Sequence, residues 1–311
     1  MRAVTLESVP STPAVTEVDT PRPAAGELLV KVAAASVNGF DIAVAAGYVQ
    51  GMMEHRFPLV LGQDFAGVVE ALGEGAEGFA VGDAVFGVVV KPFLGAGSLA
   101  QYVTVPAGHG VARIPAGVTT GEAGALGVAG ATAVRSLDAV ALAAGETVLI
   151  SGASGGVGAL VVQLAAGRGA KVIATARPGA QTDFVTGLTG AEVHVVDFTG
   201  DVEGQVRAIA PDGVDAVLHL AGDGAALAAL LRPGGQLASA TGLTQDHVKG
   251  HDVTVHTIMG SPDAQILTSL AEQVASGALR VPVTATYPLE QATQAFAAFA
   301  GTPGKIAVSC S

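Results

Sequence analysis

The chain has 311 residues, of which 50% are hydrophobic and 14% are charged, a composition that suits two globular domains and argues against a disordered chain. Its formal net charge of −12 argues against nucleic acid as a partner, although a local positive pocket for phosphates is compatible with that charge. The single cysteine, Cys310, permits neither an internal disulfide nor a cysteine-based zinc cluster.

The first residues, 1–6, lead directly into strand-like sequence and do not resemble a signal peptide. No uninterrupted apolar run approaches the roughly 18 residues that a membrane-spanning helix needs. We therefore expect a cytoplasmic protein without a membrane partner.

Residues 1 to about 120 contain short β-rich segments, such as 27–32 and 67–72, separated by Gly, Pro and Asp turns. This pattern is typical of a β barrel or a β sandwich. After a helix that ends near Ala300, a last strand at 305–308 could complete this first domain. We expect one domain formed by residues 1–120 and 281–311 together.

Between residues 121 and 280, strands alternate with helical stretches, which indicates an α/β domain with a parallel, doubly wound sheet. The expected strands are 146–150, 171–175, 192–196, 214–220, 236–239 and 252–256.

Residues 146–158 join an apolar strand to a glycine loop and then to an amphipathic stretch, which is the layout of a dinucleotide site. Gly155 and Gly156 leave room for a pyrophosphate at the positive end of a helix, and Gly158 lets that helix pack closely on its strand. Ala153 replaces the first glycine of the usual G-x-G-x-x-G pattern, so a plain tight turn is the alternative. We assign cofactor binding to Ser154, Gly155, Gly156, Val157 and Gly158.

The segment after this loop has one apolar stripe, formed by Val157, Leu160, Val161 and Leu164 at helical spacing. It predicts a helix that ends near Gly167 and Gly169. The next strand, 171–175, begins where the second strand of a dinucleotide-binding unit should begin.

Several motifs beyond the glycine loop resemble one known family. They lie at residues 35–41, 57–69, 81–87, 231–235 and 304–306. Together they resemble the medium-chain dehydrogenase/reductases, and within them the zinc-free quinone oxidoreductases related to zeta-crystallin. The resemblance spans nearly the whole chain. It implies a GroES-like catalytic domain built from both ends of the chain, a Rossmann domain between them, and a cleft that holds the nicotinamide.

The resemblance also bears on metal binding. Zinc-dependent relatives carry Gly-His-Glu where this chain has Gly62-Gln63-Asp64, and a cysteine where it has Asn38. Glutamine is a poor zinc ligand, so we expect no metal. Without a Lewis acid the substrate must already be electrophilic, as quinones and conjugated enones or enals are.

Three residues are candidate hydrogen-bond donors to such a substrate. Asn38 and Asp41 lie in a segment that the family places at the cleft, and Tyr48 could bring its hydroxyl to the same space. Tyr48 is the preferred candidate. The structural alternatives are a helix cap or a turn residue for Asp41, local backbone bonding for Asn38 and a half-buried ring for Tyr48.

The histidines give no metal or acid–base site. His194, His219 and His256 lie in expected strands, where a hydrogen-bonded structural role is the default, and His55 and His109 are expected in loops. Two further histidines, His247 and His251, could line a loop near the cofactor. Lys305 is expected to cap a helix end or to face solvent, with phosphate contact as the alternative.

The end of the second Rossmann strand indicates which nicotinamide cofactor is preferred. Sites for NAD usually carry an acidic residue there, whereas this chain has Ala176 and then Arg177. A guanidinium suits the 2′-phosphate of NADPH, and Thr175 can add a hydroxyl. A solvated Arg177 is the alternative. The resemblance places Thr132 at the nicotinamide, and we also assign Ala221 and Gly242 to the cofactor site.

These observations lead us to expect a zinc-independent, NADPH-dependent reductase of quinones or α,β-unsaturated carbonyls that forms a homodimer. An enoyl-thioester reductase of the same superfamily is the enzymatic alternative. An NADPH-binding protein with little turnover is the alternative from another class.

Overall fold

The computed structural model describes residues 1–260 and 262–310. These residues form two compact units, which we call unit 1 (Met1–Ala131 and Ser261–Ser311) and unit 2 (Thr132–Gly260). The sequence predicts domain boundaries near residues 120 and 280. Unit 1 therefore contains more of the chain than the first predicted domain does. Helix α8 (Ala264–Ala275) is part of the difference, because it packs against strand β9 (Val111–Arg113) of unit 1.

Unit 1 is built on two β sheets, in keeping with the β-rich texture of its sequence. The larger sheet has the order β16-β17-β3-β5-β6-β9 with β8 beside β3, and the smaller has the order β2-β1-β4-β7. Their remaining strands are β1 (Arg2–Leu6), β2 (Ala14–Glu17), β3 (Glu27–Val37), β4 (Glu54–Val60), β5 (Asp64–Leu72), β6 (Ala84–Val88), β7 (Phe93–Ala96), β8 (Tyr102–Pro106), β16 (Val283–Pro288) and β17 (Lys305–Ser309).

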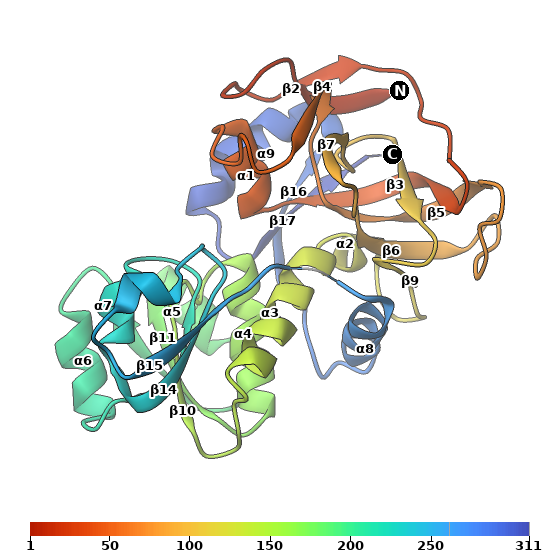
Figure 1. Ribbon diagram of the computed structural model, residues 1–311. Helices are drawn as coiled ribbons and strands as arrows, with labels where there is room; N and C mark the ends of the chain where they lie inside the picture. The colour runs from red at the N-terminus through yellow and green to blue at the C-terminus, as the bar shows by residue number, and fades with distance from the viewer. Residues whose placement is uncertain (261, 311) are drawn as a thin grey trace. The chain divides into compact units, whose positions relative to one another are not determined.

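The C-terminal strand β17 pairs antiparallel with β3, so the larger sheet combines strands from the first part of the chain with strands from its last part (Figure 1). Strand β3 is central because β5, β8 and β17 all pair with it. Its apolar residues Leu28, Val30 and Val32 are buried in the core of unit 1. This sheet confirms the expected GroES-like architecture.

Apart from α8, the helices that lie wholly in unit 1 have seven residues or fewer. They are α1 (Gly39–Ala45), α2 (Thr120–Ala123) and α9 (Ala292–Ala298), with 3-10 turns η2 (Leu289–Gln291) and η3 (Phe299–Gly301). Helix α1 follows β3 directly, so residues at the end of β3 and in the first turn of α1 lie close together.

Unit 2 contains one six-stranded sheet with the order β12-β11-β10-β13-β14-β15, in which every neighbouring pair is parallel. This is the strand order of a Rossmann fold, as the sequence predicts. The strands are β10 (Thr147–Ile150), β11 (Lys171–Ala176), β12 (Val193–Asp197), β13 (Val214–His219), β14 (Leu231–Ser239) and β15 (Val253–Thr257).

Helices cover both faces of this sheet, with α6 and α7 on one side and α4 on the other (Figure 1). The buried residues Leu149, Ile173, Val217 and Leu237 fill its core. The helical segments are α3 (Gly127–Ala139), which begins in unit 1, α4 (Gly156–Gly167), α5 (Ala180–Thr186), α6 (Val202–Ile209), α7 (Gly224–Ala228) and the 3-10 turn η1 (Gln245–Val248).

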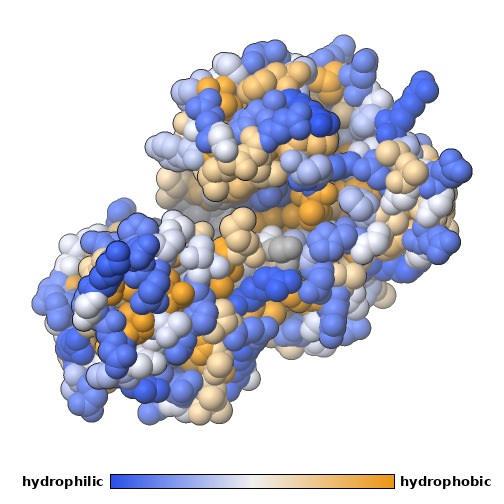
Figure 2. All heavy atoms as spheres, viewed as in Figure 1, coloured by the Kyte–Doolittle hydropathy of each residue, from blue (hydrophilic) through white to orange (hydrophobic). Residues whose placement is uncertain are grey.

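Among the described helices, none is long and apolar enough to cross a membrane. On the face drawn in Figure 2, hydrophilic side chains cover much of the surface and apolar ones appear between them.

Candidate cofactor loop and buried polar cluster

The glycine loop connects β10 to α4, as expected. Helix α4 begins at Gly156 with Gly155 as its N-cap residue, and no side chain caps this end. The first backbone N–H groups of a helix have no partner within the helix, so this end is suited to bind an anion.

Two glycines, Gly158 and Gly152, determine the conformation of the loop and its distance from α4. A Cβ on Gly158 would overlap the Gly152 carbonyl oxygen and lie 2.7 Å from the Cα of Ala153, so only glycine allows this approach of helix to loop. Gly152 has a φ of 68°, in the left-handed region that favours glycine. At Gly155 an added Cβ would come no closer than 3.3 Å to the Gly152 oxygen, so this position is more tolerant. Gly158 therefore shapes the loop, whereas Gly155 borders its open side.

Side chains from neighbouring strands brace the same loop. The Gly152 N–H donates to Oγ1 of Thr175 over 3.0 Å, and Ser151 Oγ accepts from the Leu220 N–H over 3.0 Å. Thr175 is only 5% exposed. The structure thus places Thr175 beneath the loop, a contact that sequence reasoning did not anticipate.

The structure places Arg177 on the surface just after β11. Its guanidinium lies 5.6 Å from the centre of the Phe198 ring, and its backbone N–H donates to Gln181. Nearby Asp197 ends the adjacent strand β12, opposite Ala176. Hydrogen bonds from Thr199 and then the charge of Arg177 lower the pKa of Asp197. An exposed cation therefore stands at the end of the second strand.

Two of the other assigned cofactor residues lie along the same edge of the sheet. Ala221 and Gly242 are exposed and come after β13 and β14, whose carboxyl ends share an edge with that of β10. Thr132 is 6% exposed and lies within α3, where its carbonyl oxygen accepts from Ser136 Oγ over 2.7 Å.

Unit 1 holds a buried polar cluster around Asp64, which has no solvent exposure. Its Oδ2 accepts from Ser36 Oγ at 2.6 Å and from Asn38 Nδ2 at 2.9 Å. Lys305 Nζ lies 2.6 Å from Asn38 Oδ1 and 3.4 Å from Asp64 Oδ2. A buried ammonium thus balances a buried carboxylate, and the Asn38 amide is held by both.

Asp64 also contacts the start of α3. Its Oδ1 accepts from the Val128 N–H at 2.6 Å, and its carbonyl oxygen accepts from Ser98 Oγ at 2.5 Å. One carboxylate therefore ties β5 to β3, to β17 through the lysine, and to α3.

Asp41 forms a second buried acidic position beside this cluster. Its Oδ2 accepts from the Asn38 N–H at 2.8 Å and its Oδ1 from the Gly62 N–H at 3.1 Å. Burial, with a smaller contribution from the charge of Asp64, raises the pKa of Asp41 to about 7. The helix-capping alternative considered for Asp41 thus has direct geometric support.

Tyr48 lies in a different environment from Asn38 and Asp41. Its side chain is 81% exposed, whereas Asn38 and Asp41 are 6% and 1% exposed. The structure therefore brings Asn38 and Asp41 together and leaves the Tyr48 hydroxyl at the surface of unit 1.

Two expectations about single residues are wrong. Lys305 neither caps a helix nor faces solvent: it is 3% exposed and pairs with Asp64. His55 lies in β4 and not in a loop. By contrast, His219 has the structural role expected of it, because its ring nitrogens lie 3.0 Å from Ser239 Oγ and 3.0 Å from the Gly222 carbonyl oxygen.

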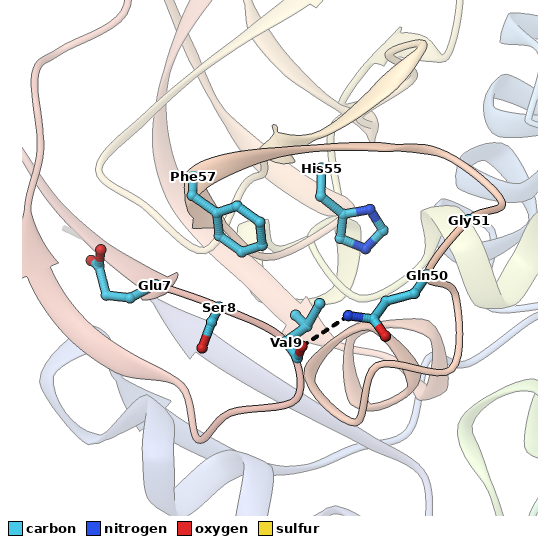
Figure 3. A pocket seen from close by; sticks show the side chains of 7 residues that line it. All are labelled: Glu7, Ser8, Val9, Gln50, Gly51, His55 and Phe57. Carbon is cyan, nitrogen blue, oxygen red and sulfur yellow. Dashed lines mark hydrogen bonds between the residues drawn. The ribbon is translucent and has the colours of Figure 1, made fainter.

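A pocket of about 360 Å³ lies within unit 1, at a place that sequence reasoning did not identify (Figure 3). It is lined by Glu7, Ser8, Val9, Gln50, Gly51, His55 and Phe57. His55 and Phe57 are two residues apart in β4, so they point to the same face of the strand. This alternation was the one signal in the sequence that could have indicated the pocket.

Two family models match the chain: alcohol dehydrogenase GroES-like domain at residues 24–116 and zinc-binding dehydrogenase at residues 189–308. Among curated proteins, it is 29% identical to the quinone oxidoreductase of Lama guanicoe, over 90% of this chain and 86% of the relative. It is 34% identical to the chloroplast envelope quinone oxidoreductase homolog of Arabidopsis thaliana, over 66% of this chain and 62% of the relative.

The chain is also 36% identical to the spectinabilin polyketide synthase system protein NorB of Streptomyces orinoci, over 88% of this chain. It spans only 12% of that relative's length.

The solved structures that resemble this chain include a quinone oxidoreductase, as do the curated relatives. The quinone oxidoreductase from Coxiella burnetii superposes with a TM-score of 0.87 at 25% identity, over 100% of this chain and 99% of that one. A mycobacterial protein complexed with NADPH superposes with a TM-score of 0.88 at 27% identity, over 99% and 100% of the two chains. The chain belongs to the medium-chain dehydrogenase/reductase superfamily of oxidoreductases, and its relatives include quinone oxidoreductases, as the sequence motifs indicated.

Proposed function

We propose that this protein is a zinc-independent, NADPH-dependent reductase that acts on quinones or α,β-unsaturated carbonyl compounds. The observation that carries the proposal is the Lys305 ammonium beside Asp64 and Asn38. These two residues stand where zinc-dependent relatives carry a glutamate and a cysteine. A fixed positive charge from the chain itself therefore lies between two of the positions that such relatives use around a metal.

The residues present do not suit zinc. Asn38 and Gln63 offer neutral amides, and a metal beside Asp64 would meet the repulsion of the lysine ammonium. Within the described part of the chain, no group of three or more His, Cys, Asp or Glu side chains could hold a metal ion. The match to the zinc-binding dehydrogenase family is therefore not taken to mean that this chain binds zinc.

The residues present do suit a dinucleotide. The uncapped N-terminus of α4 and Gly155 would hold the pyrophosphate, and Arg177 would hold a 2′-phosphate. When bound, NADPH supplies a hydride. The similarity to a mycobacterial protein complexed with NADPH supports this cofactor.

Substrate activation is assigned to Tyr48, whose exposed hydroxyl would donate a hydrogen bond to the substrate oxygen as negative charge develops there. Asn38 and Asp41 act as positioning residues in this proposal. Their polar groups are engaged with Asp64, Lys305 and the backbone of Gly62.

A second candidate is an enoyl-thioester reductase, which the similarity to a polyketide synthase protein supports. A single assay tests both candidates: NADPH oxidation is followed with a quinone, an enal and an enoyl thioester. We expect faster turnover with the quinone or enal than with the thioester. A preference for the thioester would select the second candidate, and absence of turnover with all three would leave an NADPH-binding protein.

Elemental analysis tests zinc independence separately. We expect no stoichiometric zinc in the purified protein and unchanged activity in chelator. One tightly held zinc per chain, with activity lost on its removal, would refute this part of the proposal. The expected homodimer is a further proposal, which light scattering in solution tests.

A further inference from the structure

The pocket in Figure 3 lies wholly within unit 1 and is bordered by two segments far apart in the sequence. Residues 7–9 follow β1, and residues 50–57 run into β4. The pairing of β1 with β4 brings these segments together. Its volume of about 360 Å³ falls in the range of about 300–1,000 Å³ that small-molecule sites occupy, at the end suited to one or two rings.

One polar atom in this pocket is not satisfied. Nε2 of His55 is buried and has no hydrogen-bond partner among the described residues. Leaving a buried polar atom unpaired destabilises a protein, so such an atom calls for a partner from outside the chain. In Figure 3 one ring nitrogen of His55 points toward Gln50 and the other points away from it.

The hydrogen bond made by the other ring nitrogen fixes what that partner must be. Nδ1 of His55 lies 2.9 Å from the carbonyl oxygen of Met53. A carbonyl oxygen can only accept, so Nδ1 carries the hydrogen. In the neutral ring Nε2 is then an acceptor, and its missing partner is a donor.

Two other side chains of the pocket also offer acceptors, and Ser8 adds a hydroxyl that can donate or accept. Gln50 donates through Nε2 to the Val9 carbonyl oxygen at 2.8 Å, which leaves its Oε1 to accept. Glu7 contributes a carboxylate at the rim. The Phe57 ring is 46% exposed and stacks on His55, with ring centroids 6.3 Å apart. The pocket therefore combines an aromatic surface with acceptors.

We propose that this pocket binds an aromatic ring that carries a hydroxyl group, which donates its hydrogen to Nε2 of His55 while the ring packs on Phe57. In this proposal the exposed Gln50 side chain, which lies beside His55 in the pocket, moves aside to admit the hydroxyl to the buried nitrogen. The site needs no cofactor and no second unit. Binding at this site can therefore be tested independently of the proposed reduction. Hydroquinones, which are aromatic rings with hydroxyl groups, belong to the class of ligand proposed here.

The test is cofactor-free binding of 2-naphthol, measured by calorimetry and compared with 2-methoxynaphthalene, which has the same rings but cannot donate. We expect 2-naphthol to bind about three- to ten-fold more tightly, the effect of one net hydrogen bond. His55→Phe should remove this difference and leave similar affinities for both compounds. Nitrogen NMR of the His55 ring at the same pH should show the hydrogen on Nδ1.

The matched control is His109→Phe, because His109 is exposed in a turn and lies outside the pocket. This variant should keep the wild-type preference for 2-naphthol. Equal affinity of the wild type for both compounds, absence of binding, or an unchanged preference in a folded His55→Phe variant would overturn the proposal. Because NADPH is absent, none of these results depends on whether the chain reduces quinones.

Discussion

Replacing Lys305 by methionine should strongly destabilise the protein. The substitution keeps an unbranched side chain but removes the ammonium that lies 3.4 Å from Asp64 Oδ2, in a pair whose side chains are 3% and 0% exposed. Breaking a buried ion pair by removing one partner costs about 3–5 kcal/mol, because the remaining charge stays buried without compensation. Asp64 keeps its donors Ser36, Asn38 and Val128, so we expect a loss near the lower end of that range.

The assay is urea unfolding followed by circular dichroism, since the chain contains no tryptophan. Lys249→Met is the matched control, because Lys249 pairs with Asp246 at 3.2 Å on the surface, with side chains 77% and 83% exposed. Exposed pairs contribute about 0–1 kcal/mol, so the control should unfold almost as the wild type does.

Adding Asp64→Asn to the Lys305→Met variant should recover part of the loss, because no uncompensated charge then remains. The freed Asn38 carbonyl can turn to accept from the new amide. We expect the double variant to lose less unfolding free energy than the two single variants lose together, by at least about 1 kcal/mol. A Lys305→Met protein within about 1 kcal/mol of the wild type would refute the argument, as would equal losses in the Lys305 and Lys249 variants.

Four further substitutions test other parts of the molecule. Because the pKa of Asp41 is raised to about 7, its protonated form contributes stability that is fully present below the ordinary pKa of an aspartate and is lost as pH rises through 7. Asp41→Asn should therefore reduce the dependence of the unfolding free energy on pH, measured by urea unfolding. Gly155→Val should weaken NADPH binding, measured by fluorescence titration, without unfolding the chain. Tyr48→Phe should lower kcat with an enone more than it weakens NADPH binding; equal rates would return Tyr48 to a structural role. Arg177→Ala should cut the NADPH over NADH preference in kcat/KM about ten- to a hundred-fold, sparing NADH.

The Rossmann part of the fold could be predicted because its signals are local. The helix after the glycine loop shows its apolar stripe within a few residues, and α4 spans Gly156–Gly167, close to the expected end. The strands β10 and β11 are buried on both faces and appear in the sequence as short apolar runs. Neighbouring residues alone carry this information.

The buried cluster could not be predicted because its members are distant in the sequence. Lys305 and Asp64 are separated by 241 positions, and no local pattern distinguishes a lysine paired across a sheet from one in solvent. His55 was missed for a different reason. Charged residues on both sides of His55, and Pro58 after it, favour a loop and obscure the alternation that puts His55 and Phe57 on the opposite face of the strand from Glu54 and Arg56.

The braces around the glycine loop bear on cofactor choice. Thr175 and Ser151 fix the loop through the Gly152 and Leu220 N–H groups, and Gly158 sets its distance from α4. A loop held in this way loses little conformational entropy when a pyrophosphate binds, which favours binding. This benefit is the same for NADH and NADPH, because both carry the pyrophosphate. Discrimination between them must then come from groups that meet only the 2′-phosphate. We therefore propose Arg177, which is exposed at the end of β11, for this role, and not Thr175, which is only 5% exposed and lies beneath the loop.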